Sequence, residues 1–223
     1  MRVYKNQHWH VIFLFVLLIG IKKTIDINPL ILEGSLLGIN TKSWLILSII
    51  IPIAHQIYVL ICWRLELYHK QLSKNFGENS FLYYKRLFTL LILLRPISVT
   101  ILSISNSNTF YLDSTYYWII IVFLLIPGVY AQYSVAKFFG FDRAFGIDHF
   151  DPEKYKNIPF VNKGIFKYTS NGMYLFAFFL IWLPGVIFES QAALLLALFQ
   201  HLYIWIHYYC TELPDIKYIY EKK

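Results

Sequence analysis

WLILSIIIPIAHQIYVLICW, residues 44–63, is the stretch that decides the fold. It contains no Asp, Glu, Lys or Arg, and it is about the 20 residues long that an α-helix needs to cross the hydrocarbon core of a bilayer. A helix that is apolar on every side is either buried in a large core or surrounded by lipid. The stretch therefore predicts a transmembrane helix.

Apolar runs of similar length recur along the chain, separated by short polar stretches. We expect further spans at residues 87–104, 116–139, 172–188 and 191–209. Glu189 and Ser190 leave room only for a tight turn, so the last two spans should form an antiparallel hairpin. Residues 9–21 are a shorter run that either spans with snorkelling flanks or lies in the interface, and residues 29–39 are expected to re-enter or rest on the membrane.

The composition agrees with this pattern. Of 223 residues, 57% are hydrophobic, 19% are aromatic and only 15% are charged, which lies outside the usual range of a soluble globular domain. We find no internal repeat and no separate soluble domain. The sequence predicts an all-α fold, a polytopic integral membrane protein with about five to six transmembrane helices that ends in a helical hairpin.

The net charge of +7 indicates membrane topology rather than nucleic-acid binding, because the basic residues lie at the ends of apolar runs. The connection at residues 64–86 is rich in Lys and Arg, whereas residues 105–115 contain neither. The first connection should therefore be cytoplasmic, together with residues 140–171 and the C-terminal tail. If residues 9–21 span, Lys22, Lys23 and Lys42 lie outside, against the same rule.

Cys62 and Cys210 are the only cysteines, so the chain has neither a disulfide framework nor a zinc motif. We expect a reducing compartment and no bound metal. The partners that the sequence predicts are the lipid bilayer and a membrane lipid, with no nucleic acid.

Arg95 and Pro96 lie in the middle of an apolar run, LLILLRPISV. An unpaired cation at that depth costs about 3 kcal/mol on insertion scales, so a functional role is the first hypothesis. The alternative is that Arg95 snorkels or binds a carbonyl that the Pro96 kink frees. His55, near Pro52 in its own span, is expected to be a hydrogen-bonded packing residue.

Polar side chains gather at the cytoplasmic end of the last span. At about 3.6 residues per turn they fall on two adjacent rows, Gln200, His207 and Thr211 beside His201, Tyr208 and Glu212. Such a wedge on an apolar helix indicates that it lines a cavity, since lipid-facing polar groups are penalised. The alternative is interfacial decoration, which explains the aromatic residues but not the histidines and the carboxylate.

Two segments near the C-terminus carry a family resemblance. GIFKYTSNGMY at residues 164–174 is followed by the hairpin and then by YYCTELPDIKYIY at residues 208–220. This order resembles the C-terminal half of the superfamily of phospholipid methyltransferases and isoprenylcysteine carboxyl methyltransferases, and it covers roughly the last 90 residues. In that superfamily a glycine–aromatic turn precedes a motif that ends in tyrosine, and an acidic pair follows two hydrophobic helices.

Gly164 and Phe166 match the turn, Asn171, Met173 and Tyr174 match the second motif, and Glu212 matches one acid of the pair. FGI at residues 145–147 is similar to the phospholipid N-methyltransferase branch. Three positions depart from the pattern: Gly172 replaces a proline, Asn171 replaces the histidine of the carboxyl methyltransferases, and Thr211 replaces the first acid.

The resemblance implies S-adenosylmethionine as cofactor, bound between the loop before the penultimate helix and the end of the final helix. It also implies an acceptor that enters from the bilayer. The domain, residues 1–223, would then divide into N-terminal helices, residues 1–139, and a cofactor-binding loop, hairpin and tail, residues 140–223. The implied cofactor-binding residues are Gly164, Phe166, Asn171, Gly172, Met173, Tyr174 and Glu212, and Tyr208 and Arg95 are assigned to the substrate.

The sequence favours a lipid amine such as phosphatidylethanolamine as the methyl acceptor. Residues 172–213 contain no Lys or Arg that could hold a carboxylate, whereas the acidic and aromatic lining suits an amine. His207 is the candidate catalytic base, because its ordinary pKa lies near 6.5; a packing role is the alternative. An isoprenylcysteine-type carboxyl methyltransferase, with Arg95 or a loop lysine as its clamp, and a non-catalytic membrane scaffold remain open. The expected location is a bacterial inner membrane or the endoplasmic reticulum, with the active site facing the cytoplasm.

Overall fold

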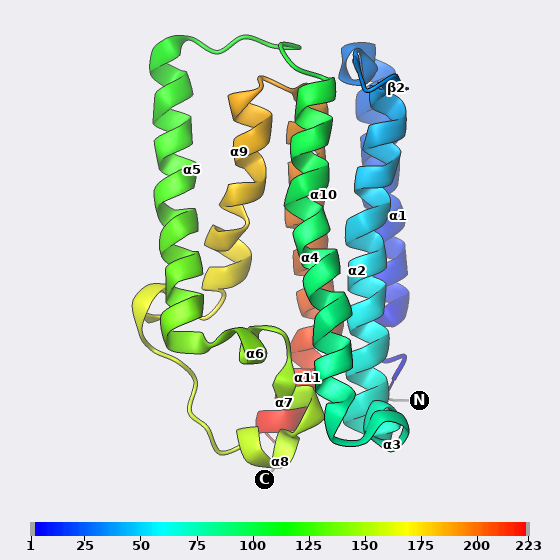
Figure 1. Cartoon of the computed structure of the whole chain (residues 1–223), viewed down its shortest axis with the longest axis vertical. Helices are drawn as coiled ribbons and strands as arrows, with labels where there is room; N and C mark the ends of the chain where they lie inside the picture. The colour runs from blue at the N-terminus through cyan, green and yellow to red at the C-terminus, as the bar shows by residue number, and fades with distance from the viewer. Residues whose placement is uncertain (1–2, 222–223) are drawn as a thin grey trace.

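The computed structural model describes residues 3–221, is 80% helical, and confirms the all-α prediction (Figure 1). The helices of the bundle are α1 (Gln7–Ile27), α2 (Thr41–His69), α4 (Ser80–Ser105), α5 (Ser114–Ser134), α9 (Phe179–Ile187) and α10 (Gln191–His207). The short ones are α3 (Gln71–Phe76), α6 (Phe141–Ala144), α7 (Ile147–Phe150), α8 (Pro152–Tyr155) and α11 (Leu213–Tyr220). Short 3₁₀ turns also lie in two connections, at Gly77–Asn79 and at Gly164–Lys167.

Four helical stretches are long and apolar enough to cross a membrane: Thr41–His69, Gln71–Ser105, Ser114–Phe139 and Gln191–Tyr220. They contain four of the five expected spans, and the fifth corresponds to a shorter apolar helix, Met173–Ile187. Helix α1 is not among the four, yet it runs alongside α10 (Figure 1). The run at residues 9–21 is therefore part of the bundle.

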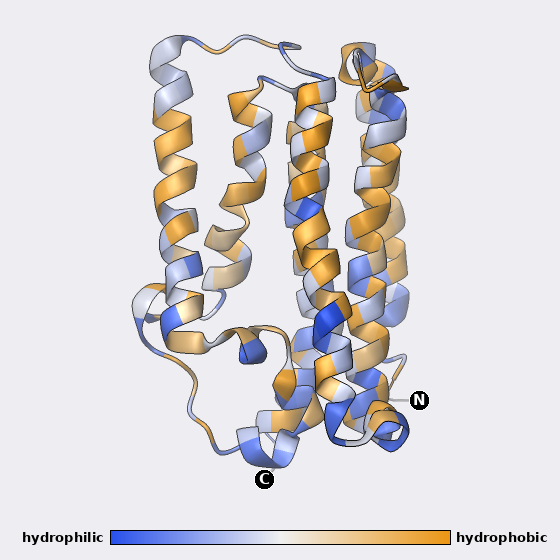
Figure 2. Cartoon of the chain, viewed as in Figure 1, coloured by the Kyte–Doolittle hydropathy of each residue, from blue (hydrophilic) through white to orange (hydrophobic). Residues whose placement is uncertain are grey.

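The bundle is held together by close packing of α2 on α4, of α5 on α9, and of α10 on α1, α4 and α9. Ala192, Ala193 and Ala197 on α10 are completely buried, and their small side chains let neighbouring helices approach closely, as is typical of helix contacts in membranes. The outward faces are apolar, most visibly on α5 (Figure 2), where Phe123 and Ile126 are each 63% exposed. Such a surface is suited to lipid.

One end of the bundle is closed by the segment that was expected to re-enter or rest on the membrane. It forms a 3₁₀ turn, η1 (Pro29–Leu32), and a minimal antiparallel hairpin of β1 (Ser35–Leu36) and β2 (Ile39–Asn40). Asn106 after α4 donates to the carbonyls of Leu30 (3.2 Å) and Glu33 (2.8 Å). The segment therefore covers the end of α4 and does not run back along the bundle.

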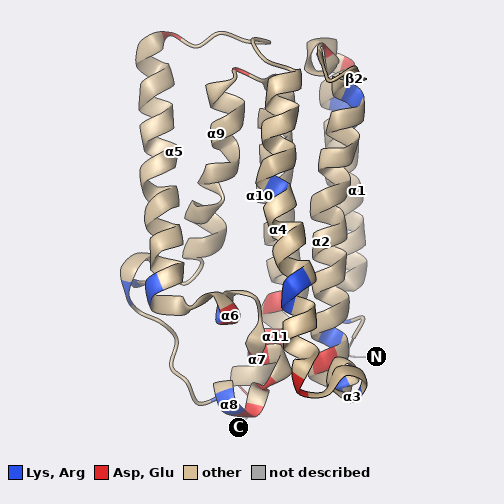
Figure 3. Ribbon diagram, viewed as in Figure 1, with Lys and Arg blue, Asp and Glu red and all other residues tan. Residues whose placement is uncertain are grey.

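The opposite end carries most of the charged residues and both chain ends (Figures 1 and 3). Helices α3, α6, α7, α8 and α11 all lie there, so the three basic segments that the sequence assigned to one side of the membrane do share one end. Helices α9 and α10 form the expected antiparallel hairpin, and Glu189 adopts a left-handed φ of 49° in the turn between them.

Candidate active site

Three π-helical segments, η3 (Val135–Phe139), η5 (Met173–Ala177) and η6 (Tyr208–Glu212), interrupt or extend the helices near the charged end. A π-helical turn bonds residue i to i+5, is rare, and often occurs at functional sites. Residues from all three segments line two neighbouring cavities. The irregular backbone is thus concentrated around one place in the molecule.

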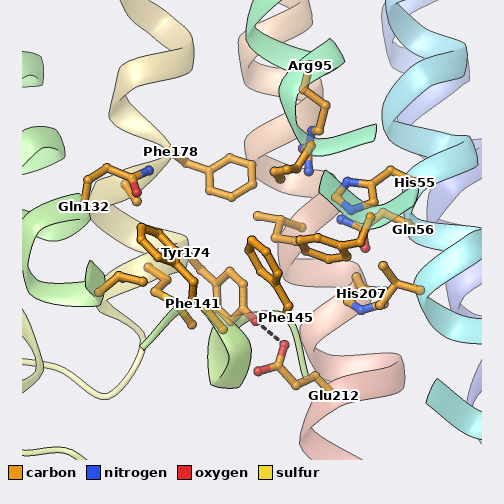
Figure 4. A pocket seen from close by; sticks show the side chains of 18 of the residues that line it. His55, Gln56, Arg95, Gln132, Phe141, Phe145, Tyr174, Phe178, His207 and Glu212 are labelled. Atoms are coloured by element: carbon orange, nitrogen blue, oxygen red, sulfur yellow. Dashed lines mark hydrogen bonds between the residues drawn. The ribbon is translucent and has the colours of Figure 1, made fainter. Parts of the chain in front are cut away.

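The larger cavity, which we call the bundle cavity, has a volume of about 170 Å³ and lies between α2, α4, α5, η5 and α10, with α6 at one end (Figure 4). Its walls are mainly apolar and aromatic. Two exposed residues line it, Gln132 on α5 and Phe141 on α6, and the side chain of Phe141 is 50% exposed. The cavity therefore opens to the surface beside these two residues. Its polar lining residues are His55, Gln56, Arg95, Gln132, Tyr174, His207 and Glu212.

The second cavity, which we call the loop cavity, is smaller, about 50 Å³, and lies between α7, α11 and the start of η5. Its polar lining residues include Arg143, Asp148, His149 and Tyr220. It shares four residues with the bundle cavity: Trp63, Ala144, Met173 and Glu212. Glu212 therefore stands in the wall between a cavity inside the bundle and a polar cavity among the loops. Two reactants bound from opposite sides would meet there.

Glu212 reaches this wall because of η6. In a regular α-helix, residues five apart point in different directions, whereas a π-helical turn brings them to nearly the same face. Glu212 thus lines the same cavity as His207, five residues before it. The carboxylate accepts a hydrogen bond from the hydroxyl of Tyr174 on η5 (Figure 4).

The η6 turn is fastened from outside by Arg64, which is completely buried on α2. Its Nη2 donates to the carbonyls of Cys210 (3.2 Å) and Thr211 (3.1 Å), and its Nε donates to Asp215 (2.8 Å). Pro214 has no N–H to give to the preceding turn, so carbonyls there need other donors. Arg64 supplies them and holds the η6 backbone next to the cavity.

His149 and Asp148 form a buried ion pair at the loop cavity, with 3.0 Å between Nδ1 and Oδ1. Burial by itself lowers the pKa of His149, but the Asp148 carboxylate and, more weakly, Asp215 raise it to about 9. Burial likewise raises the pKa of Asp148, and His149, Tyr220 and Arg143 together lower it below its usual value. Both groups are therefore charged near neutral pH.

The structure brings together five of the residues singled out from the sequence. Arg95, Met173, Tyr174, His207 and Glu212 all line the bundle cavity. Tyr208 is next to them, with 5.5 Å between its ring and that of Tyr174, and Asn171 lies within reach of its hydroxyl.

The other three lie farther back and shape the loop. Gly164 has a left-handed φ of 61°, and a Cβ there would lie 2.5 Å from Ser134 Oγ. Phe166 stacks on Phe139 with 5.2 Å between ring centroids, and Gly172 packs against Ile165. None of the three lines either cavity. They fix the loop against α5 and η3.

One of the two expected polar rows lies wholly in the interior, and the other reaches it only in part. Gln200, His207 and Thr211 are buried, whereas the ring of His201 faces α9 and accepts a hydrogen bond from Trp182 Nε1 (3.1 Å). Glu212, the last residue of the second row, lines the bundle cavity because η6 departs from the regular helical repeat just before it.

Sequence reasoning missed residues from the N-terminal half and from the loop. His55 and Gln56 line the bundle cavity, and His55 is not the hydrogen-bonded packing residue that we expected, because neither ring nitrogen has a partner. A usable signal existed, since both are polar residues inside an apolar run. Arg143, Asp148 and His149 flank the FGI segment, and no spacing rule connects them to Glu212, which lies more than 60 residues away in the chain.

No curated protein and no solved structure matches this chain significantly. Residues 117–223 match the phospholipid methyltransferase family, which confirms the resemblance and supports a membrane methyltransferase. The match begins in α5 and contains η3, η5 and η6 as well as the whole loop cavity except Trp63. Over residues 117–223, just under half of its length, this chain is similar to the phospholipid methyltransferase family.

Proposed function

We propose that this chain is an S-adenosylmethionine-dependent methyltransferase that methylates the nitrogen of a membrane lipid amine such as phosphatidylethanolamine. The observation that carries the proposal is the position of Glu212 in the wall between the two cavities. A water-soluble cofactor would arrive through the loops, and a lipid would arrive through the opening beside Gln132 and Phe141.

The residues around the loop cavity have the chemistry that the cofactor needs. Arg143 can bind a carboxylate, and Asp148 and Glu212 can bind an ammonium or ribose hydroxyls through charge-assisted hydrogen bonds. Phe139 and Phe160 offer aromatic surfaces for an adenine. When bound, S-adenosylmethionine supplies a methyl group on a positively charged sulfur. We propose direct contacts from Met173, Tyr174 and Glu212, with Gly164, Phe166, Asn171 and Gly172 fixing the course of the loop.

The residues of the bundle cavity would orient the acceptor and remove its proton. The cavity is narrow and mostly apolar, so it excludes water and restricts the direction from which an amine can approach Glu212. A lipid ammonium must lose a proton before its nitrogen can attack, and His207, whose Nδ1 has no partner, is the proposed base. Tyr208 would border the acceptor. We propose that the charged end faces the cytoplasm, because the basic segments lie there.

Cofactor binding is the first test. Calorimetry with S-adenosylmethionine should give saturable binding, and Glu212→Gln should weaken it about tenfold or more, because a charged hydrogen bond is lost. Glu78→Gln is the matched control, since Glu78 is exposed on the loop between α3 and α4. Equal affinities for all three proteins would mean that Glu212 does not touch the cofactor.

The acceptor is tested with purified protein, labelled S-adenosylmethionine and either phosphatidylethanolamine or a farnesylcysteine analogue. We expect label in the phospholipid. Label in the farnesylcysteine alone would replace the amine assignment by carboxyl methylation, and label in neither would support a scaffold.

A further inference from the structure

We infer that Arg95, His55 and Gln200 form an anion-binding site inside the bilayer, which holds the phosphate or carboxylate of the acceptor lipid and points its amine toward Glu212. The inference deepens the proposed function and rests on it for the identity of the amine. The anion site itself rests on the contacts of Arg95.

Arg95 is 1% exposed, and its side chain points into the bundle cavity (Figure 4). Nε donates to Gln200 Oε1 at 2.8 Å, while Nη2 has no hydrogen-bond partner. The guanidinium lies 5.0 Å from the centroid of the Phe178 ring. Within residues 3–221 Arg95 forms no ion pair, so a full positive charge lies beside the cavity without a counter-ion.

The groups around Arg95 add donors rather than acceptors. Gln200 has given its oxygen to Arg95 and its Nε2 is unpaired. His55 is 3% exposed, and both of its ring nitrogens are unpaired, so it can donate from at least one of them. Figure 4 shows His55 and Arg95 on the same side of the cavity. A place with several unused donors and a cation is suited to an anion.

The other fully buried arginine shows how this chain neutralises such a charge when the role is structural. Arg64 binds the Asp215 carboxylate and several backbone carbonyls, as described above. Arg95 binds a glutamine in place of a carboxylate, and it lines the cavity with Nη2 lacking a hydrogen-bond partner. Since an uncompensated charge in a bilayer is costly, a bound anion is the group that would complete the site.

The cavity also has a charge direction. Among its lining residues Arg95 is the only Lys or Arg and Glu212 is the only Asp or Glu, and they lie at opposite ends (Figure 4). A lipid headgroup that carries an anion and an amine would therefore be oriented, with its anion at Arg95 and its amine near His207 and Glu212. A lipid amine without an anionic group would gain only the contact near His207 and Glu212.

The test compares two lipids with the same acyl chains: phosphatidylethanolamine and a diacylglycerol that carries an aminoethyl carbamate in place of the phosphate. Native mass spectrometry of the purified full chain measures the binding of each. We expect the phosphate-containing lipid to bind about ten to a hundred times more tightly. Arg95→Met should reduce this preference to about twofold or less, and Arg95→Lys should retain part of it. Arg86→Met, at an exposed position on the same helix, should leave it unchanged.

A second pair of ligands, a farnesylcysteine analogue and its amide, identifies the source of the anion. If the protein prefers the carboxylate to the amide and Arg95→Met loses that preference, the anion site is supported and its ligand is a carboxylate lipid. Equal binding within both pairs by the unmodified chain would overturn the site. So would an Arg95→Met variant that keeps the lipid preference but loses affinity for S-adenosylmethionine, because Arg95 would then bind the cofactor.

If Arg95→Met does not fold, His55→Leu takes its place, and an undiminished lipid preference in that variant counts against the site. A clear lipid preference without methyl transfer to any lipid would refute the proposed function and leave the anion site standing.

Discussion

The two ends of α10 treat buried polar groups in opposite ways. At its first turn, Asn106 Oδ1 accepts hydrogen bonds from Ser190 Oγ (3.0 Å) and the Ala192 amide (2.9 Å), and Nδ2 donates to two carbonyls. Farther along α10, around the bundle cavity, single nitrogens of Arg95, Gln200 and His207 and both ring nitrogens of His55 have no partner. Both regions are buried to a similar degree.

The difference separates structure from function. A polar side chain with all its partners in place specifies how elements join, and its removal leaves other groups unpaired. A buried polar side chain without partners lowers stability. It is retained where it binds a ligand or takes part in a reaction. Mutations should therefore reduce stability at the Asn106 end and reduce activity at the cavity end.

The largest effect is expected at Asn106. Asn106→Ala would leave a buried amide and a hydroxyl without their acceptor and would remove one donor from each of two carbonyls. The free energy of unfolding should therefore fall by roughly 3 to 5 kcal/mol. Chemical denaturation in mixed micelles measures this change. Methyl transfer per folded molecule should stay within about twofold of the unmodified protein. A stable variant with little activity would reverse the assignment of the two regions.

The next effect is expected at His207. His207→Ala should lower turnover by about 100-fold if His207 removes the proton of the acceptor, while the affinity for S-adenosylmethionine stays nearly the same. The rate of the unmodified enzyme should rise with pH as the acceptor loses its proton. The exposed residue His8 gives the matched control, His8→Ala. A packing role would show itself as a reduced folded yield with normal turnover per folded molecule.

His149 belongs to both groups, because Nδ1 is paired with Asp148, whereas Nε2 makes no hydrogen bond and lies 3.7 Å from the Asp215 carboxylate. Folding raises the His149 pKa from 6.5 to about 9, so its contribution to stability is complete below pH 6.5 and disappears as the pH rises through 9. The unmodified protein should exceed His149→Gln in stability by roughly 1 to 3 kcal/mol near pH 6, and the difference should shrink by pH 9.5. Unfolding curves of both proteins across this range measure it. A difference that grows with pH would contradict the ion pair.

The smallest effect on stability is expected at His55. His55→Leu replaces two unpaired nitrogens by a side chain of similar size, so the free energy of unfolding should change by less than about 1 kcal/mol, most simply as a gain. A melting curve beside that of Asn106→Ala makes the comparison directly. A loss as large as that of Asn106→Ala would show that His55 has partners after all.

The helices were predictable because each depends on a long local pattern. Residues 44–63, 87–104 and 191–209 fall within α2, α4 and α10 extended by η6. The tight turn at Glu189 followed from the few residues available. The path of residues 29–39 was not predictable, since it depends on Asn106, more than 60 residues later in the chain.

The site was predictable only in part. Tyr174 and Glu212 came from the resemblance, and the structure adds the hydrogen bond that joins them. A constant helical repeat places His201 beside Glu212, but the His201 ring faces α9, and η6 alters the repeat only from Tyr208 onward. Asp148 and His149 reach the cavity through the course of a loop, and no periodic pattern describes such a course.

The opening of the bundle cavity beside Gln132 and Phe141 determines which concentration the enzyme would sense. An acceptor that enters there comes from the surrounding leaflet and not from solution, so its supply is set by its mole fraction among the neighbouring lipids. Adding detergent at a constant total amount of acceptor dilutes that fraction and should slow methyl transfer, as in surface-dilution kinetics. The Michaelis constant for the acceptor, expressed in mole per cent, would then stay the same when the micelle concentration changes. Expressed in micromolar units, it would change.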